Sequence, residues 1–291
     1  MNYYDYVSYK LKKDYINTNN FSETLPRNTI ELKEAEQTES FIYIVDCIDE
    51  AIKNNGFIQY FQPQFKLENG KLLGVEVLLR LKTADGKFIS PREFIPIAEC
   101  TGQIYTIEQW VYNEALNTKK NWEEQGFDKY YFSINLSAKT LTSEKYFNEL
   151  LDILRSYDIN YEYIIIEITE TDIIFDPDRA FKNVNILKDL GFNIALDDFG
   201  TGFSSLTYLD KLPIDIIKFD YSIIKKVPEN DKTCFIIESL LELGHDLGFK
   251  AVAEGIERKN QLDYLSEIKC DIGQGFLLGK PMPQQEILSY R

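Results

Sequence analysis

The 291-residue sequence contains a single histidine and only four cysteines. The cysteines are far apart and form no C-x-x-C pair, so reduced thiols are expected instead of disulfides or a zinc site. His245 stands in the helical stretch IIESLLELGHDLGF with no second histidine or cysteine nearby, which is typical of a helix residue without a chemical role. This scarcity argues against hydrolases that depend on a histidine cluster. Any hydrolase built on this sequence must work with carboxylates.

Basic residues are also in the minority, with 32 Lys and Arg against 47 Asp and Glu and a formal net charge of −15. Such a charge favours solubility and argues against binding long nucleic acid through a basic surface. It is compatible with a small anionic substrate if metal ions neutralise the site locally. No apolar run reaches the length of a membrane span, and the opening residues MNYYDYVSYKLKKDY lack a signal-peptide core. We therefore expect a cytoplasmic protein without a membrane span.

Residues 1–40 differ in composition from the rest of the chain. They are rich in Tyr, Asn and Lys and show little apolar periodicity, so we interpret them as an N-terminal extension of unknown role. Residues 41–291 are expected to form one catalytic domain, because a chain of this length suits a single α/β barrel with a short appendage. The first segment of that domain, FIYIVDCIDEAIKNN, has helical spacing and ends before Gly56.

Short apolar, β-branched or aromatic runs recur after this segment and predict strands. They comprise residues 57–61, 72–79, 131–136, 163–168, 193–196, 214–219, 250–253 and 272–277. Most are separated by stretches with helical character, such as DRAFKNVNILKDLG. Buried strands that alternate with helices indicate an α/β protein with a mostly parallel sheet. About eight strands in some 240 residues fit a closed (β/α)-type barrel better than an open sheet, although alternation alone leaves both open.

Polar side chains interrupt the ends of five of these strands. They are Asn135, Glu167, the pair Asp197 and Asp198, Lys218 and Glu254. Each one alone fits a strand end that faces solvent. In a barrel, however, the carboxyl ends of parallel strands meet on one face, where catalytic residues gather. Glu76 belongs with them, because it breaks the apolar strand LLGVEVLLR, where a carboxylate is costly to bury without a cation.

The carboxylates and the amide of this group form an all-oxygen set of metal ligands: Glu76, Asn135, Glu167, Asp197, Asp198 and Glu254. Mg²⁺ and Mn²⁺ prefer such a set, whereas zinc sites usually recruit His or Cys. The adjacent aspartates suit a metal pair, and two ions about 3.5–4 Å apart can activate a water and stabilise a phosphoryl displacement. Lys218 is placed to orient that water or to offset developing charge. The Gly-rich segment after the aspartates lacks the spacing of a phosphate-binding loop.

These residues also carry a family resemblance. The sequence resembles the EAL phosphodiesterase family from about Phe41 to Pro283. The matching motifs are FQP (61–63), EVLLR (76–80), SPREFIPIAECTG (90–102), SINLS (133–137), EITE (167–170), DDFGTGFSSL (197–206), LPIDIIKFD (212–220), AEGIE (253–257) and GQGF (273–276). Each motif alone is modest, but nine in family order at family spacing are strongly specific.

The resemblance implies a modified (β/α)8 TIM-type barrel whose first strand is antiparallel. It also implies hydrolysis of cyclic di-GMP to linear pGpG with two Mg²⁺ or Mn²⁺ ions per active site, and a homodimer. It gives the six oxygen ligands to the metals and Lys218 to the nucleophilic water. The remaining assignments are Glu257 and Gln274 in the inner site, Glu170 as anchor of the loop after the aspartates, and Gln62 and Arg80 as substrate contacts.

Departures from the family pattern are few. The name-giving tripeptide is Glu-Val-Leu at 76–78, Leu81 replaces a common Trp, Gln64 stands where an aliphatic residue is usual, and Tyr221 replaces a frequent Arg. None of them removes a metal ligand or the lysine, which favours an active enzyme over the second hypothesis, a cyclic di-GMP receptor or scaffold that does not hydrolyse. A third hypothesis, a sugar hydrolase with paired carboxylates, leaves Asn135, Lys218 and the double aspartate without roles.

Overall fold

The computed structural model describes residues 27–199 and 211–290. These residues fall into two compact units, one with residues 27–58 and 79–108 and the other with residues 59–78 and 109–290. Most of the Gly-rich segment expected after Asp198 lies outside the described residues, as does most of the N-terminal extension. The boundary expected at residue 40 remains a prediction.

The first unit is mainly helical. It contains α2 (Arg27–Asn54), β3 (Phe88–Ile89), α3 (Pro91–Thr101) and the beginning of α4 (Ile104–Glu124). Helix α2 ends before Gly56, where the sequence predicts a stop. Gln103, between α3 and α4, donates a hydrogen bond to Asp49 Oδ1 over 2.6 Å and so ties this turn to α2. Strand β3 is not predicted from the sequence, because two residues are too short to show a strand period.

The second unit contains most of a closed barrel of eight strands. They are β1 (Phe57–Lys66), β2 (Leu72–Lys82), β4 (Tyr131–Asn135), β5 (Ile164–Thr169), β6 (Asn193–Phe199), β7 (Ile216–Phe219), β8 (Lys250–Ala253) and β9 (Ile272–Gly273). From β2 through β9 each strand is parallel to the next, β1 is antiparallel to β9, and pairing of β1 with β2 closes the barrel. The modified TIM-type barrel with an antiparallel first strand is confirmed.

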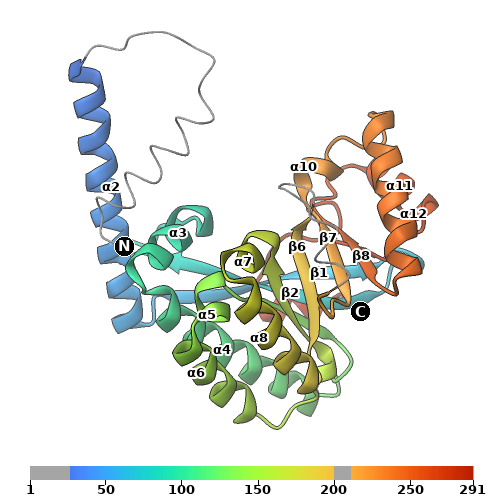
Figure 1. The fold of residues 1–291 in the computed structure, drawn as a ribbon, viewed down its shortest axis with the longest axis horizontal. Helices are drawn as coiled ribbons and strands as arrows, with labels where there is room; N and C mark the ends of the chain where they lie inside the picture. Colours follow the sequence, from blue (N-terminus) through green and yellow to red (C-terminus); the bar gives the residue numbers. More distant parts are fainter. Residues whose placement is uncertain (1–26, 200–210, 291) are drawn as a thin grey trace. The chain divides into compact units, whose positions relative to one another are not determined.

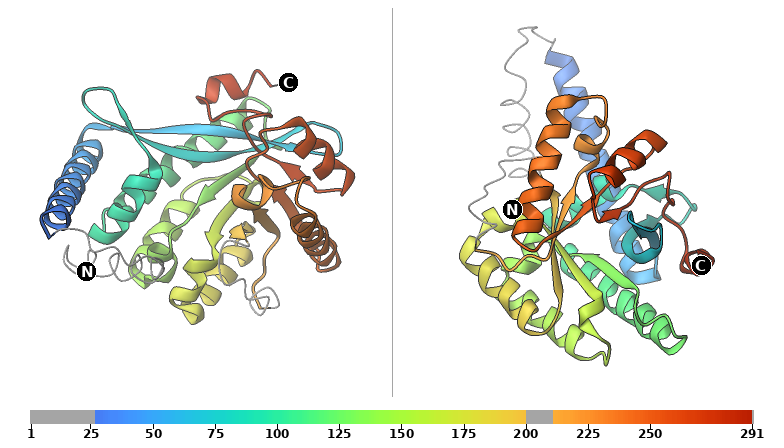
Figure 2. Two further views of the ribbon diagram at one scale, coloured as in Figure 1. Left: turned by 90° about the horizontal axis from the view of Figure 1, so that it is seen from above. Right: turned by 90° about the vertical axis from the view of Figure 1, so that its right-hand side faces the viewer.

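Helices lie along the outside of these strands, as expected for a (β/α) barrel (Figure 1). They are α4, α5 (Ala138–Thr142), α6 (Glu144–Arg155), α7 (Glu170–Phe175), α8 (Pro177–Asp189), α10 (Tyr221–Ile224), α11 (Asp231–Asp246), α12 (Lys259–Glu267) and α13 (Gln284–Ile287), with the 3-10 turn Tyr161–Tyr163. Helix α8 packs beside β6 and α11 beside β8, and Figure 2 shows the green and yellow helices on the outer side of their strands. None of the helices in the described parts combines the length and apolar character needed to cross a membrane.

One layer of apolar side chains fills the barrel interior. It consists of Ile165, Ala195, Ile216, Val252 and Ile272, one from each strand from β5 to β9, all buried. Branched side chains of this kind close the interior of TIM-type barrels. The polar residues of the candidate site lie next to this layer, toward the carboxyl ends of the strands.

Candidate active site

Four of the polar residues expected at strand ends, together with Gln274, lie directly above this apolar layer. Two residues beyond each layer member, the chain carries Glu167, Asp197, Lys218, Glu254 and Gln274. Side chains two apart on a strand share a face, so all five face the barrel interior at the carboxyl ends of their strands. The alternation of side chains along the strands therefore gives the barrel interior an apolar layer and, at the carboxyl ends of the strands, a polar layer.

Lys218 is the centre of this polar group. Its Nζ lies 2.8 Å from Glu254 Oε1, 2.9 Å from Glu167 Oε2 and 3.2 Å from Asp197 Oδ2, and Glu76 Oε1 is 4.0 Å away. The lysine side chain is only 1% exposed. The structure thus brings together four of the expected carboxylates and the expected lysine, although they come from strands up to 178 residues apart in sequence (76 to 254).

One ammonium group faces four carboxylates, and the pKa values reflect this imbalance. Burial raises the pKa of Glu167 well above its usual range, and the neighbouring carboxylates raise it further against the opposing effect of Lys218. Burial likewise raises the pKa of Glu254 to about 8. Burial alone would lower the pKa of Lys218, but Asp197, Glu167 and Glu254 hold it well above its ordinary value. The site is short of positive charge.

Two side-chain amides hold Glu76 at the edge of this cluster. Gln274 Nε2 donates to Glu76 Oε2 over 2.5 Å, and Asn135 Nδ2 approaches Glu76 Oε1 at 3.4 Å. Asn135 is the last residue of β4 and its side chain is exposed. Glu76 and Gln274 are buried, so the predicted ligand inside the apolar strand has its own hydrogen-bond donors.

The two aspartates lie within β6, not after it as the sequence predicts. Strand β6 continues to Phe199, and its pairing with β7 shifts register between Leu196 and Phe199, as at a β-bulge. Asp198 has a φ of 56°, a left-handed conformation that Asp tolerates better than most residues. Its backbone N–H donates to Asp197 Oδ1 over 2.8 Å. Bulges re-aim side chains, and here Asp197 reaches Lys218 while the neighbouring Asp198 is exposed.

Glu170 is the first residue of α7, half-buried at the end of β5. The start of this helix is fixed by a capping box, in which Asp172 Oδ2 accepts from the backbone N–H of Thr169 over 2.7 Å and the Asp172 N–H donates to Thr169 Oγ1 over 3.2 Å. The other Asp172 oxygen accepts from the N–H of Ala138, the first residue of α5, three residues after Asn135. Asp172 therefore joins two segments of the site. The T-x-x-D spacing is the sequence signal that could have identified it.

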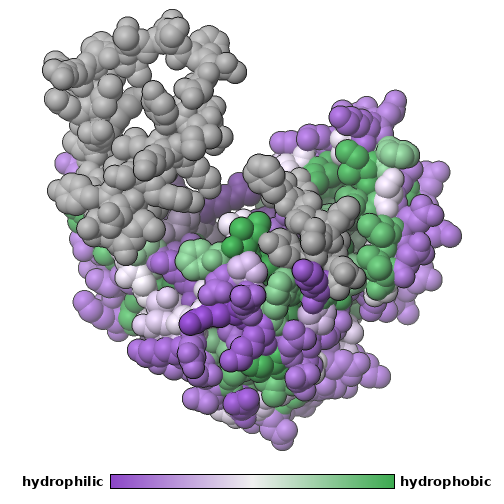
Figure 3. Space-filling view, viewed as in Figure 1, coloured by the Kyte–Doolittle hydropathy of each residue, from purple (hydrophilic) through white to green (hydrophobic). Residues whose placement is uncertain are grey.

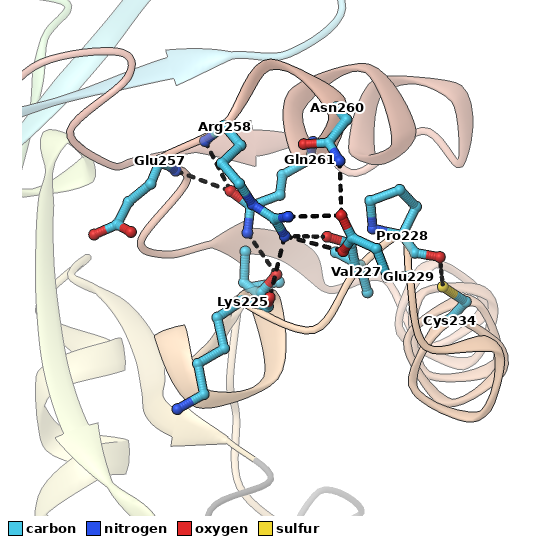
Figure 4. Close-up of polar contacts among 10 residues, drawn as sticks. Lys225, Val227, Pro228, Glu229, Cys234, Glu257, Arg258, Asn260 and Gln261 are labelled. Carbon is cyan, nitrogen blue, oxygen red and sulfur yellow. Dashed lines mark hydrogen bonds and ion pairs between the residues drawn. The ribbon is translucent and has the colours of Figure 1, made fainter.

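Glu257 lies on the loop between β8 and α12, exposed and three residues beyond Glu254. Its backbone N–H donates to Gln261 Oε1 over 3.0 Å, and Figure 4 shows its carboxylate pointing away from the polar contacts of this loop. Arg258 holds the loop by pairing with Glu229 over 2.6 Å and by donating to the carbonyls of residues 225 and 227. Neither Arg258 nor Gln261 is identified as part of the site from the sequence.

The two expected substrate contacts have different surroundings. Gln62 is buried in β1, where its Oε1 accepts from Gln274 Nε2 over 3.1 Å and its Nε2 donates to the Gly279 carbonyl over 3.1 Å. Arg80 lies in the part of β2 that belongs to the first unit, with Nη1 donating to the Leu79 carbonyl over 2.9 Å. Its substrate contact remains a prediction.

The donor set fits divalent cations in its chemistry. Both carboxylate oxygens of Glu167 are buried, and although Oε2 pairs with Lys218 Nζ over 2.9 Å, Oε1 has no hydrogen-bond partner among the described residues. Such atoms are costly unless a cation compensates them. In the described part of the chain no three Asp, Glu, His or Cys side chains are arranged to hold one ion, and three of the carboxylates lie within 3.2 Å of Lys218 Nζ. The charge and ligand type suit divalent cations such as Mg²⁺ or Mn²⁺.

Comparisons with known proteins identify the family of this chain. The sequence model of the EAL domain matches residues 46–281. The chain is 36% identical to the signaling protein YkoW of Bacillus subtilis over 81% of its own length and 30% of that protein. It is 35% identical to the probable cyclic di-GMP phosphodiesterase PdeG of Escherichia coli, over 81% of this chain and 47% of PdeG. The chain thus matches less than half the length of these relatives.

A solved structure gives the same result in three dimensions. The MucR phosphodiesterase in complex with cyclic di-GMP superimposes with a TM-score of 0.80 at 32% identity, covering 84% of this chain and 99% of that one. An EAL domain protein from Listeria monocytogenes matches with a TM-score of 0.72 at 34% identity, covering 82% of this chain and 94% of that one.

Proposed function

Because this chain belongs to the EAL domain family, we propose that it hydrolyses one phosphodiester bond of cyclic di-GMP and releases linear pGpG. The observation that carries the proposal is the group of four carboxylates around the buried Lys218 at the carboxyl ends of the barrel strands. Similarity to the probable cyclic di-GMP phosphodiesterase PdeG and to the MucR phosphodiesterase in complex with cyclic di-GMP supports the substrate class. An acidic protein with no histidine in this group needs cations to bind and cleave a phosphodiester.

Two divalent cations, Mg²⁺ or Mn²⁺, supply the charge that activates a water and stabilises the attacking and leaving oxygens when they are bound. The residues that would hold them are Glu76, Asn135, Glu167, Asp197, Asp198 and Glu254. Protonation competes with this role, since ligands must be deprotonated and the pKa of Glu254 is raised to about 8. Lys218 would orient the attacking water through Nζ.

The other expected residues support this chemistry in our proposal. Gln62 and Arg80 contact the substrate, and Glu257 and Gln274 complete the inner site. Glu170 anchors the loop that follows the two aspartates, from a helix start that the Thr169–Asp172 capping box fixes. Because the chain covers less than half of the curated relatives it resembles, only the activity of this domain is proposed.

Removing the metal ions is expected to abolish hydrolysis. Excess EDTA should reduce pGpG formation to the background, and Mg²⁺ or Mn²⁺ added beyond the chelator should restore it. Ca²⁺ should restore little activity, because its larger radius and looser coordination disturb a two-metal geometry. Chromatography of the nucleotides after timed incubation measures each condition. Full activity in excess EDTA would eliminate the proposed role of the carboxylates.

The homodimer that the family resemblance implies also belongs to this proposal. Phe235, Ile236 and Leu243 are exposed on α11 and Leu247 directly after it, and Figure 3 shows hydrophobic surface gathered where Figure 1 places this helix. Contiguous exposed apolar surface usually marks an interaction site. A second copy of the chain is the partner that we propose for it.

A further inference from the structure

A chain of buried amide groups links Gln64 in β1 to Glu76 in β2. Gln64 Nε2 donates to Gln274 Oε1 over 2.8 Å, and Gln274 Nε2 donates to Glu76 Oε2 over 2.5 Å. The same Gln274 nitrogen donates to Gln62 Oε1 over 3.1 Å, and Gln62 in turn donates to the Gly279 carbonyl. The three glutamines are at most 8% exposed, so water does not compete strongly for these bonds.

The strand register places Gln64 against Gln274. Strands β1 and β9 pair antiparallel with Phe65 opposite Gly273 and Lys66 opposite Ile272. Continuing this register by one residue sets Gln64 opposite Gln274, and directly opposed side chains start about 4.5–5.5 Å apart at Cβ. The backbone of Gln274 is fixed as well, because its N–H donates to the Ala253 carbonyl over 2.9 Å. Only the side-chain torsions of Gln274 are left to be determined.

The orientation of the Gln274 carboxamide decides what Glu76 meets. As observed, the amide oxygen faces the Gln64 donor and the amide nitrogen faces the Glu76 carboxylate. A half turn of the carboxamide would bring its oxygen against the carboxylate and its nitrogen against Gln64 Nε2, pairing acceptor with acceptor and donor with donor. The terminal torsion of glutamine is soft, so hydrogen-bond partners select the orientation. Gln64 is the partner on the amide oxygen.

We propose that Gln64 is a positioning residue, which holds the Gln274 carboxamide in the one orientation that fixes Glu76 for cation binding. The inference rests on the proposed function for the identity of the cations and of the reaction. Gln64 does not contact Glu76 itself; it contacts Gln274, which donates to Glu76. Partners that orient metal ligands typically contribute about 10–100-fold in metal affinity or activity.

The substitution Gln64→Met tests this, since methionine is similar in length but offers no amide donor. We expect it to weaken Mn²⁺ binding about tenfold, measured by isothermal titration without substrate. The variant Gln64→Met/Gln274→Met should bind Mn²⁺ no more weakly than Gln274→Met alone, because Gln64 acts on Glu76 only through the Gln274 side chain, which the second substitution already removes. The variant Gln64→Ile repeats the test with an aliphatic residue, the type that is usual at this position in the EAL family.

Gln59→Met is the matched control. Gln59 lies on the same strand, and its Nε2 donates to the Val111 carbonyl over 2.7 Å. It should lose thermal stability comparably and keep the Mn²⁺ affinity of the wild type. An unchanged Mn²⁺ affinity in Gln64→Met and Gln64→Ile, or losses that add in the double variant, would overturn the inference. If the Gln64 variants bind Mn²⁺ more weakly than the wild type does, but the wild type leaves cyclic di-GMP intact, the proposed function alone would be overturned.

Discussion

The variant Glu76→Ala should lose about 10³-fold in kcat for cyclic di-GMP hydrolysis, because metal charge stabilisation is worth several kcal/mol and each 1.36 kcal/mol is a factor of ten. Glu76 is a buried carboxylate that receives a hydrogen bond from Gln274 and lies 4.0 Å from Lys218 Nζ. Folding should survive, since removing one of four crowded carboxylates relieves repulsion. Initial rates at saturating Mn²⁺ and thermal melting curves of both proteins measure the two effects.

Asp215→Ala is a suitable control for this experiment. Asp215 directly precedes β7, where it pairs with Lys188 over 2.7 Å and accepts from the N–H of Ile194. It lies at the opposite end of the strand from Lys218, so its removal should lower the melting temperature and leave kcat close to that of the wild type. Hydrolysis by Glu76→Ala at the wild-type rate would show that this carboxylate holds no catalytic metal.

Lys218 should produce the second largest effect. Lys218→Ala is expected to lower kcat and kcat/KM together by about 10²–10³-fold, the usual cost of removing one electrostatic group that acts in the transition state. Affinity for cyclic di-GMP should change little. Loss of the lysine side chain also leaves Glu167, Asp197 and Glu254 without their ammonium partner. Metal-free protein should therefore lose stability, whereas metal-bound protein should retain it.

Lys119→Ala separates the chemical effect from the structural one. Lys119 is as deeply buried as Lys218, but it donates to the carbonyls of Asp128 and Tyr130 and pairs with Glu123. Its removal should lower the melting temperature with or without metal and leave kcat near the wild-type value. If Lys218→Ala behaves in the same way, with kcat maintained and a large drop in melting temperature, Lys218 is structural and its assignment to the attacking water is wrong.

The sequence predicts the barrel well because its signals are local. Apolar runs, most of them separated by helical stretches, locate all eight strands, and a period of two places Glu167 and Lys218 on the inner face above the apolar layer. Strand ends are predicted less well. Strand β1 continues to Lys66 instead of ending at Phe61, and β9 contains only Ile272 and Gly273. Pairing with a distant neighbour decides where a strand ends, and no local pattern encodes it.

The contacts within the site depend on such distant pairings. That Asp197 and Asp198 lie in an irregular part of β6 follows from the register with β7, which a one-dimensional pattern does not contain. Gln64 is visible in the sequence only as a departure from the family pattern. Its partner Gln274 is 210 residues away, and only the antiparallel pairing of β1 and β9 brings them together. The position of Lys218 amid four carboxylates likewise appears only when the barrel closes.

The proposal that this domain is a phosphodiesterase is tested most directly by the fate of cyclic di-GMP. Purified protein is incubated with the dinucleotide and Mn²⁺, and the nucleotides are separated by anion-exchange chromatography over time. The account predicts conversion to linear pGpG as the first product, with repeated turnover when substrate is in excess. Protein that binds cyclic di-GMP tightly and returns it unchanged would contradict the account and identify the domain as a receptor.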